Sequence, residues 1–315
     1  MKWLAVINPA SGGGKAKKTW GKKIKHRLEG IINFKPYYTT GPGHAIDYVS
    51  QEMNHYDGFI SVGGDGTSNE VINGIVKGLN EQPSKTKIFA IIPVGNGNDI
   101  AHAFDLPYND IKASCDLFKN DHSTFRMVDV GKATGFDFDN KPVTRYFCGV
   151  LSAGFDAEVA HKTNQNLKFL PGTANYVRSL LSSIIRLSQH HFSVSILNRE
   201  IEAKFEKEGI LMAVGLGSYY GAGMKICPDA EVDDGLFHVT FVNRVSRRTL
   251  LGVFPKVYGG KHITHPAVEL YTAPQLSIQG SEKTLWQVDG EISGYTPITI
   301  ETLPNVLKIL SPKHF

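Results

Sequence analysis

Apolar positions in the first hundred residues follow two different periods. Short apolar runs of strand length alternate with stretches in which apolar residues recur every three or four positions, as in a helix. The runs expected to be strands cover residues 3–7, 31–39, 58–62 and 88–92. Helices are expected at residues 43–54 and 67–79 and around Trp20, Ile24 and Leu28. Strands that alternate with helices are typical of a doubly wound, mostly parallel sheet covered on both faces, so we expect an α/β fold here.

The pattern changes after about residue 126. Short β-branched and aromatic runs, bounded by turn residues, then indicate a mainly antiparallel β-sandwich domain. Its expected strands include residues 145–150, 192–197, 210–214, 237–242 and 275–278. One longer helix is expected at residues 173–189, where apolar residues repeat at helical spacing at Tyr176, Leu180, Ile184 and Leu187.

Length and composition favour two folded domains. A chain of 315 residues is longer than one hydrophobic core usually organises. We place the α/β domain at residues 1–125, completed by residues 306–315, and the β-rich domain at residues 126–305. Hydrophobic residues at 41% and charged residues at 20% are globular values, which exclude a disordered, collagen-like or coiled-coil chain.

Charge and cysteine content exclude further classes. A net charge of +4, without an aromatic platform or a recognition fold, gives no argument for a nucleic-acid partner. The three cysteines are odd in number and form no C-x-x-C pair, so they predict reduced thiols in a cytosol. No apolar run reaches the roughly 18 residues that span a bilayer, so we expect a cytoplasmic protein whose contact with a membrane is peripheral.

The segment most specific for chemistry is the glycine-rich stretch at residues 61–70, which follows an apolar run and opens a helix. Its three glycines within four positions let backbone N–H groups approach an anion, and a helix N-terminus adds partial positive charge, so phosphate is expected here. Asp65 is unfavourable beside a bare phosphate, which indicates that it meets a divalent cation, a hydroxyl group or a backbone turn. The alternative is a tight turn in which Asp65 or Thr67 caps the helix.

Two further polar, glycine-rich loops follow expected strands. Residues 8–15 could wrap phosphates with backbone amides and Lys15, although they lack the P-loop pattern. In residues 93–99, Asn98 and Asp99 could bind a ligand or cap a turn. No G-x-G-x-x-G motif with a downstream ribose carboxylate is present, which disfavours a dinucleotide dehydrogenase. Open α/β sheets bind ligands at the carboxyl ends of their strands, so these loops are the expected place for a ligand.

Three such loops resemble the diacylglycerol kinase catalytic domain family of bacterial lipid kinases, related to sphingosine and ceramide kinases. The matching motifs are NPASGGGKA at residues 8–16, TTGPGHA at 39–45, GGDGTSNEVINGI at 63–75, PVGNGNDIAHAF at 93–104, GAGMKICPDAEVDDGLF at 221–237 and VDGE at 288–291. The GGDGT motif alone also resembles the NAD kinases, which share the superfamily fold. The PDAEVDDG and VDGE segments match the lipid kinases instead.

By that resemblance, ATP would lie against the glycine-rich loops, with the β domain supplying the other wall. The implied nucleotide-binding residues are Asn8, Pro9, Ala10, Ser11, Gly12, Thr40, Gly64, Asp65, Gly66, Thr67, Ser68, Asn69, Glu70 and Asn96. The fourth loop departs from the commoner family pattern, because Asn96 stands where Thr is usual and His102 where Arg is usual.

Phosphoryl transfer needs positioning and charge neutralisation more than covalent chemistry, so a metal ion on the phosphates and a carboxylate near the acceptor hydroxyl should suffice. The catalytic candidates are Asp65, Asp289 and Glu291. Asp289 and Glu291 are two residues apart and would face the same side of an extended strand, with Gly290 leaving room for substrate or a sharp turn. The resemblance places the proton acceptor in this segment, and we expect Asp289 with Glu291 as its orienting partner, or the reverse. The alternative is an exposed hairpin turn with ordinary surface carboxylates.

An acidic turn at residues 231–235 is a candidate cation site, because hard cations take mixed carboxylate and carbonyl oxygens from such turns. The resemblance implies a structural Mg²⁺ held by Asp234 with main-chain oxygens of Glu231 and Leu236. A plain Asp-Asp-Gly turn is the alternative.

Basic residues gather along the first expected helix, with no acid before Glu29. They are Lys15, Lys18, Lys22 and Lys25 at helical spacing and, beside them, Lys17, Lys23 and Arg27. A cationic face of this kind can draw an enzyme to anionic phospholipid. A solvated face is the alternative.

Residues and resemblance together predict an ATP- and Mg²⁺-dependent kinase that phosphorylates the primary hydroxyl of diacylglycerol to phosphatidic acid at the inner face of the membrane. Acceptor choice depends on apolar walls rather than on glycine loops, so phosphatidylglycerol, monoacylglycerol or a sphingoid base is an alternative acceptor. The opposing class is a nucleotide-binding regulatory protein without turnover, against which the three candidate carboxylates argue. A homodimer is compatible with the sequence.

Overall fold

The chain divides into two compact units, each described here by itself. The computed structural model describes residues 1–81, 86–119, 121–165, 182–184, 187–198, 201–281 and 283–313. Unit 1 comprises Met1–Val130 and Pro304–Phe315, and unit 2 comprises Gly131–Leu303. The sequence places the boundary at residue 125, and the structural division falls inside strand β5 (Ser123–Phe136). Strand β16 (Glu291–Pro312) also contributes to both units.

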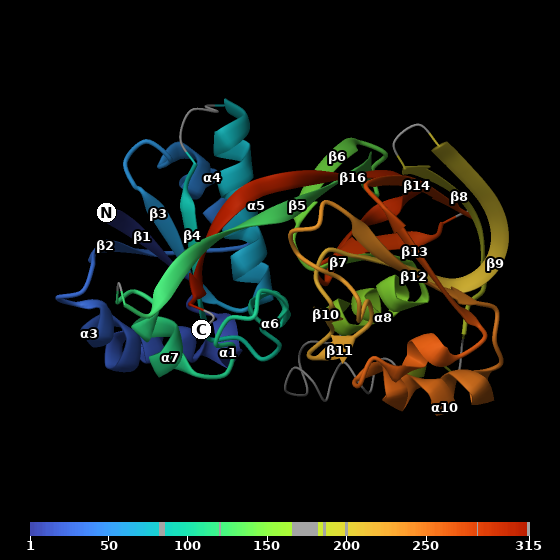
Figure 1. Cartoon of the computed structure of the whole chain (residues 1–315), viewed down its shortest axis with the longest axis horizontal. Helices are drawn as coiled ribbons and strands as arrows, with labels where there is room; N and C mark the ends of the chain where they lie inside the picture. The colour runs from blue at the N-terminus through green and yellow to red at the C-terminus, as the bar shows by residue number, and fades with distance from the viewer. Residues whose placement is uncertain are drawn as a thin grey trace. The chain divides into compact units, whose positions relative to one another are not determined.

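Unit 1 is built on a parallel sheet in the order β2, β1, β3, β4, β16 (Figure 1). Its first four strands are β1 (Lys2–Ile7), β2 (Asn33–Tyr38), β3 (Gly58–Gly63) and β4 (Ile88–Pro93). Nearly every residue of β1, β3 and β4 is buried, as in parallel strands covered on both faces. The α/β fold expected for the N-terminal part is confirmed.

Helices connect these strands. They are α1 (Ser11–Gly14), α2 (Ala16–Thr19), the π-helix η1 (Trp20–Ile24), α3 (Lys25–Leu28), α4 (His44–Gln51), α5 (Asp65–Glu81), α6 (Asp99–Ala103) and α7 (Ile111–Asp116). The three longer expected segments correspond to α4, α5 and the α2–α3 stretch. Among the described residues, no helix combines the length and apolar character needed to cross a bilayer.

The first helical stretch contains a π turn for a reason visible in its sequence. Its buried residues are Ala16, Trp20, Ile24 and Leu28, each four positions after the last. An α-helix needs about 3.6 residues per turn, so a strict spacing of four moves each apolar side chain about 40° further around the axis. The wider turn η1 takes up this drift and returns the apolar positions to the core.

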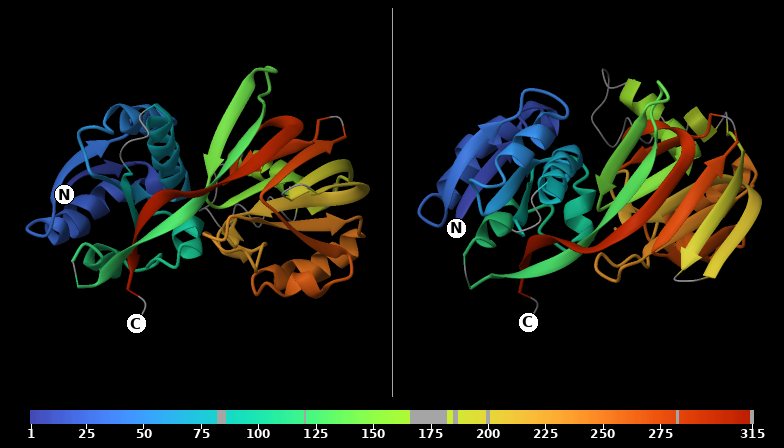
Figure 2. Two further views of the ribbon diagram at one scale, coloured as in Figure 1. Left: turned by 45° about the horizontal axis from the view of Figure 1, so that its top comes forward. Right: turned by 90° about the horizontal axis from the view of Figure 1, so that it is seen from above.

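Unit 2 is mainly antiparallel, and the expected β domain is confirmed. Its strands are β6 (Pro142–Phe147), β7 (Val150–Gly154), β8 (His190–Asn198), β9 (Ile201–Gly215), β10 (Tyr219–Tyr220), β11 (Met224–Lys225), β12 (Phe237–Asn243), β13 (Val268–Ala273), β14 (Gln275–Gly280) and β15 (Leu285–Val288). Figure 2 shows β5 and β6 as a long antiparallel hairpin. One large core, which includes Phe192, Phe241 and Trp286, packs between the strands.

The helices of unit 2 are α8 (Phe155–Gln165), α10 (Arg247–Val257) and the 3₁₀-helix η2 (Lys261–Thr264). Most of the helix expected at residues 173–189 lies outside the described residues. Residues 182–184 are helical and residues 187–189 are not, because β8 starts at His190.

Candidate active site

The first turn of helix α5 fixes the loop that follows β1. Asn8 donates its Nδ2 to Thr67 Oγ1 at 3.1 Å, and the hydroxyl oxygens of Ser11 and Thr67 lie 3.3 Å apart. Thr67 is buried, so these contacts hold the first loop against the start of the helix. The first N–H groups of a helix have no intrahelical partner and the helix dipole adds positive charge, so this end of α5 is suited to phosphate.

Asp65 links the same helix to the loop after β4. Its Oδ1 accepts a hydrogen bond from the backbone N–H of Ile100 at 3.0 Å, in the first turn of α6. The pKa of Asp65 is raised, because burial outweighs the backbone hydrogen bonds that lower it. The partners expected for Asp65 were a divalent cation, a hydroxyl group or a backbone turn, and the structure shows the backbone contact. The carboxylate caps α6 and not its own helix.

Glu70 links α5 to the loop after β2. Its two carboxylate oxygens accept the backbone N–H groups of Gly43 at 2.8 Å and Ala45 at 3.1 Å, at the start of α4. Thr40, in the same loop, is exposed, and its hydroxyl lies 2.9 Å from Nδ1 of His44. His44 is therefore a hydrogen-bond partner of the second loop.

Glycines allow the loops to touch through their backbones. A Cβ atom on Gly95 would lie 2.5 Å from the Cα of Gly64, closer than side-chain carbons approach. A Cβ atom on Gly12, which has a φ of 62°, would lie 2.5 Å from the carbonyl oxygen of Val94. The first, third and fourth loops are thus in direct contact, and the contact between Gly12 and Val94 joins loops that are far apart in the chain.

The fourth loop depends on Asn98 more than on Asn96. Asn96 is exposed, whereas Asn98 is buried and adopts a left-handed φ of 59°. Asn98 Oδ1 accepts the N–H of Gly95 at 3.0 Å, and its Nδ2 donates to the carbonyl of Tyr108 at 3.1 Å. This residue shapes the turn that brings Gly95 against α5. Its type, between a strand and a short helix, is the signal that sequence alone offered.

In unit 2, Asp289 and Gly290 form a two-residue hairpin turn between β15 and β16. Their φ angles are 47° and 90°, and Val288 pairs with Glu291 across the turn. The expectation that Asp289 and Glu291 share one face of an extended strand is wrong, because Asp289 lies in the turn and Glu291 begins the next strand. Asp-Gly is the sequence that such a turn favours, since both residues tolerate positive φ.

The Asp289 side chain is nevertheless fixed. Its Oδ1 accepts the backbone N–H of Val150 at 3.0 Å, and its own N–H donates to the carbonyl of Val150 at 3.1 Å. A Cβ on the preceding residue, Gly149, would lie 2.3 Å from Oδ1, so glycine leaves the space that the carboxylate occupies. Glu291 is exposed.

The acidic turn at residues 231–235 is organised around Asp234. Its Oδ1 accepts the N–H of Leu236 at 2.9 Å, and its Oδ2 lies 2.9 Å from Nε2 of His238. Glu231 is exposed. The described residues contain no group of three His, Cys, Asp or Glu side chains that could hold a metal ion. A cation here would fit the arrangement that the resemblance implies, with one carboxylate and main-chain oxygens as ligands.

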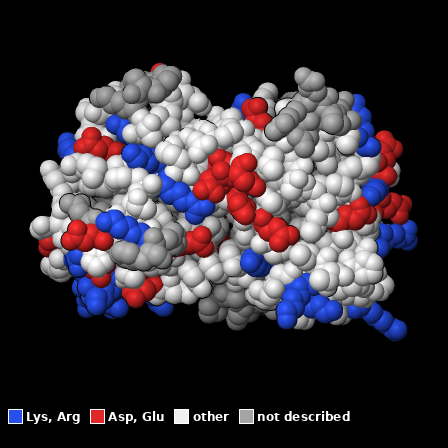
Figure 3. Space-filling view, viewed as in Figure 1, with Lys and Arg blue, Asp and Glu red and all other residues white. Residues whose placement is uncertain are grey.

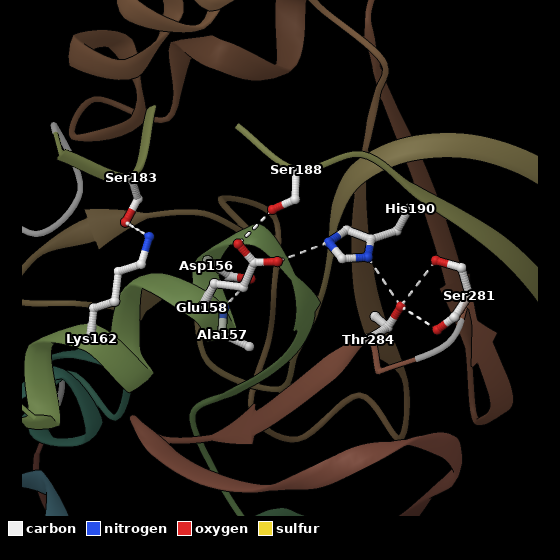
Figure 4. Close-up of polar contacts among 9 residues, drawn as sticks. All are labelled: Asp156, Ala157, Glu158, Lys162, Ser183, Ser188, His190, Ser281 and Thr284. Atoms are coloured by element: carbon white, nitrogen blue, oxygen red, sulfur yellow. Dashed lines mark hydrogen bonds and ion pairs between the residues drawn. The ribbon is translucent and has the colours of Figure 1, made fainter. Parts of the chain in front are cut away.

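A buried polar cluster at the start of α8 was not anticipated from the sequence (Figure 4). Nε2 of His190 lies 3.3 Å from Oε1 of Glu158, and Nδ1 of His190 lies 3.1 Å from the hydroxyl oxygen of Thr284. Burial raises the pKa of Glu158, but hydrogen bonds from His190 and Ser188 outweigh it and the pKa is lowered. Thr284 is fully buried and donates its hydroxyl to the carbonyl of Ser281 at 2.8 Å, so this acid–His–Thr set ties elements together and offers no nucleophile to a substrate.

Comparison with known proteins agrees with this arrangement. The profile described as "Diacylglycerol kinase catalytic domain" matches residues 2–133, and that described as "YegS C-terminal NAD kinase beta sandwich-like domain" matches residues 149–311. With the loops gathered at α5, these matches define a kinase. The chain belongs to the diacylglycerol kinase-like family, whose members act on a lipid alcohol.

Relatives match along nearly the whole chain. A protein of Staphylococcus haemolyticus named diacylglycerol kinase is 29% identical over 309 residues, which cover 98% of this chain and 87% of that protein. One of Staphylococcus aureus strain MRSA252 with the same name is 28% identical over 308 residues, 98% of this chain and 91% of that protein. A crystal structure described as a diacylglycerol kinase of Bacillus anthracis strain Sterne has the same fold, with a TM-score of 0.71 at 23% identity over 98% of this chain and 96% of that one.

Proposed function

We propose that the enzyme transfers the γ-phosphate of ATP, in the presence of Mg²⁺, to the primary hydroxyl of diacylglycerol and so forms phosphatidic acid. The observation that carries this proposal is the linkage of four loops at the first two turns of α5 through Asn8, Asp65 and Glu70. Glycine-rich loops at a helix N-terminus offer the backbone N–H groups that recognise a polyphosphate. The names of the relatives support diacylglycerol as the acceptor.

Different residues have different tasks in this proposal. The loops that contain Asn8–Gly12, Thr40 and Asn96 and the first turn of α5 would hold the triphosphate, while Asp65 and Glu70 keep the loops in register. Asp289 would take the proton from the lipid hydroxyl as the phosphoryl group is transferred, with Glu291 next to it. Mg²⁺ would neutralise charge on the phosphates, and a structural Mg²⁺ would be held by Asp234 with the carbonyls of Glu231 and Leu236.

The basic strip, defined as the seven cations of the α1–α3 stretch, supports action on a membrane lipid. These are Lys15, Lys17, Lys18, Lys22, Lys23, Lys25 and Arg27, all exposed. Only Lys25 lies within ion-pair distance of an acid, Glu29, among the described residues. Lys and Arg side chains gather at the lower left of Figure 3, where α3 lies in Figure 1. An anionic phospholipid surface is the partner that this strip fits.

The test is phosphate transfer from labelled ATP to vesicles that contain diacylglycerol, phosphatidylglycerol, monoacylglycerol or a sphingoid base. We expect transfer to diacylglycerol that depends on Mg²⁺. Asp289→Asn should lower kcat by about 10²-fold or more, because general acid–base groups contribute about 10²–10⁴-fold. Asp65→Ala should lower activity by releasing the fourth loop. The matched control is Asp139→Asn, whose carboxylate is exposed in a hairpin turn and pairs only with Lys141 at 3.5 Å among the described contacts.

Three outcomes would contradict the proposal. Transfer to another lipid but not to diacylglycerol would replace the acceptor and leave the kinase chemistry in place. Binding of ATP without transfer to any lipid would favour a regulatory protein. Unchanged activity in Asp289→Asn, with the protein folded, would remove Asp289 from the mechanism.

A further inference from the structure

A buried glutamine accepts a hydrogen bond from the turn that contains Asp289. Gln287 lies in β15, two residues before Asp289, and its Oε1 accepts the backbone N–H of Gly290 at 2.6 Å. The side chain is almost completely enclosed, with 2% exposed. The hairpin therefore has a second contact in addition to the contact between Asp289 and Val150.

The same amide is fixed at its other end. Gln287 Nε2 donates to the hydroxyl of Ser152 in β7 at 2.6 Å, and the two residues are direct cross-strand partners. Ser152 is fully buried, and its hydroxyl also interacts with the carboxylate of Asp156 at the start of α8. The hydrogen bonds run in one direction, from the turn amide through Gln287 to Ser152. Such chains are mutually strengthened where the surroundings are apolar.

A fully buried glutamine is unusual. Trp286 and Val288, its neighbours in β15, point into the apolar core, so Gln287 points to the opposite face of the strand, where it is also buried and lies beside its cross-strand partner Ser152. Polar side chains are seldom fully buried, because an amide removed from water must find hydrogen-bond partners for both its carbonyl and its NH₂ group. Gln287 recovers them on Gly290 and Ser152, so its polar contacts are directed at the turn.

We propose that Gln287 is a positioning residue for the phosphoryl transfer, and that by holding the N–H of Gly290 it fixes the direction in which the Asp289 carboxylate points. This inference rests on the proposed role of Asp289. An aspartate at a φ of 47° and a glycine at 90° can adopt other conformations, and the hydrogen bond from Gly290 to Gln287 selects one of them. A displacement of about 1 Å at a reacting group is enough to lower a rate by about 10²-fold.

The test compares three variants in the vesicle assay. Gln287→Met keeps the length of the side chain and removes both hydrogen bonds, and we expect kcat to fall by about 10- to 100-fold while KM for ATP stays within about 2-fold. Ser152→Ala leaves the Gly290 contact in place, so kcat should fall less, although the unpaired amide should lower the Tm by roughly 2–6 °C. The matched control, Gln279→Met, makes the same substitution at an exposed position of β14 and should change neither quantity.

The double variant Ser152→Ala with Gln287→Met separates positioning from stability. Replacing both partners of a buried hydrogen bond with apolar groups is close to neutral for stability, so the Tm should recover towards wild type. If Gln287 acts by positioning, kcat stays low in spite of the recovered Tm. Recovery of kcat together with Tm, or a Gln287→Met enzyme with wild-type kcat, would overturn the inference. Loss of activity in Asp289→Asn alongside an active Gln287→Met would reject this inference and retain the proposed function, whereas an active Asp289→Asn would reject the role of Asp289 itself.

Discussion

At the scale of single residues, three carboxylates that the sequence analysis assigns to the site accept hydrogen bonds from backbone N–H groups. Asp65, Glu70 and Asp289 accept these hydrogen bonds from residues that lie 35, 27 and 139 positions away in the chain. Sequence identified the carboxylates because of their glycine-rich surroundings, but it could not supply the partners, since those depend on which loops the sheet brings together. Each carboxylate thus positions backbone in addition to any role towards a ligand.

Gly95 gives a prediction at this scale. Gly95→Ala would place a Cβ 2.5 Å from the Cα of Gly64, and backbone on both sides must move. We expect a loss of roughly 1–3 kcal/mol in stability, as for other overpacked sites, together with weaker ATP binding because the third and fourth loops separate. Calorimetry and ATP titration measure the two effects.

The control for that substitution is Gly252→Ala in α10, where an added Cβ would meet no atom within 4 Å. It should be neutral or slightly stabilising, because alanine favours a helix over glycine. A Gly95→Ala enzyme with the stability and ATP affinity of wild type would show that the loops do not need their close contact.

At the scale of elements, a three-strand polar cluster in unit 2 sets a dependence on pH. Glu269 in β13 accepts hydrogen bonds from Lys207 in β9 at 2.6 Å and Asn243 in β12 at 2.7 Å, and also from Tyr271. The hydrogen bond from Lys207, followed by those from Tyr271 and Asn243, lowers the pKa of Glu269 from 4.5 to about 2. Because the folded pKa lies below the unfolded one, the stabilisation is present above pH 4.5 and is lost as the pH falls towards 2.

Glu269→Gln should therefore lower the Tm at pH 7 and do so less at pH 3. The effect should be about 1 kcal/mol or less, because a third of the side chain is exposed and solvent screens the charge. Thermal unfolding of both proteins across this pH range measures it. Glu208→Gln, in the exposed pair with Arg244, is the matched control and should change the Tm little at either pH. An equal loss at pH 7 and pH 3 would mean that the charge of Glu269 is not what stabilises the cluster.

The basic strip gives a second prediction at this scale. Lys18→Gln with Lys22→Gln should weaken binding to vesicles with anionic lipid by about 30-fold, since each cation near such a surface contributes about 1 kcal/mol. Sedimentation with vesicles at low salt measures the change, and neutral vesicles should show no difference. Lys141→Gln, which removes an exposed cation from the β5–β6 hairpin, should bind as wild type. If the double variant binds anionic vesicles as well as the wild type does, the basic strip is a solvated surface and not a membrane-binding one.

For the whole molecule, the sequence predicts best where the hydrophobic period is unambiguous. Strands β1, β3 and β4 follow from it, because buried parallel strands are nearly uninterrupted apolar runs, whereas the short helix α7 was not expected. At Asp289 and Gly290 the backbone forms a hairpin turn instead of the expected extended strand, because Asp-Gly favours the positive φ angles of such a turn. The roles of Gln287 and Glu158 could not be predicted, since each depends on burial and on partners that only the folded chain provides.

Strand β16 imposes an order on how the protein can be made. Lys308 and Ile309 complete the parallel sheet of unit 1 beside Ile88 and Phe89, although more than 200 residues separate them in the chain. During synthesis on a ribosome, one edge of β4 therefore stays unpaired, and the sheet of unit 1 stays incomplete, until β16 has emerged. Because β16 contributes to both units of this kinase, neither unit can be completed before this strand has emerged.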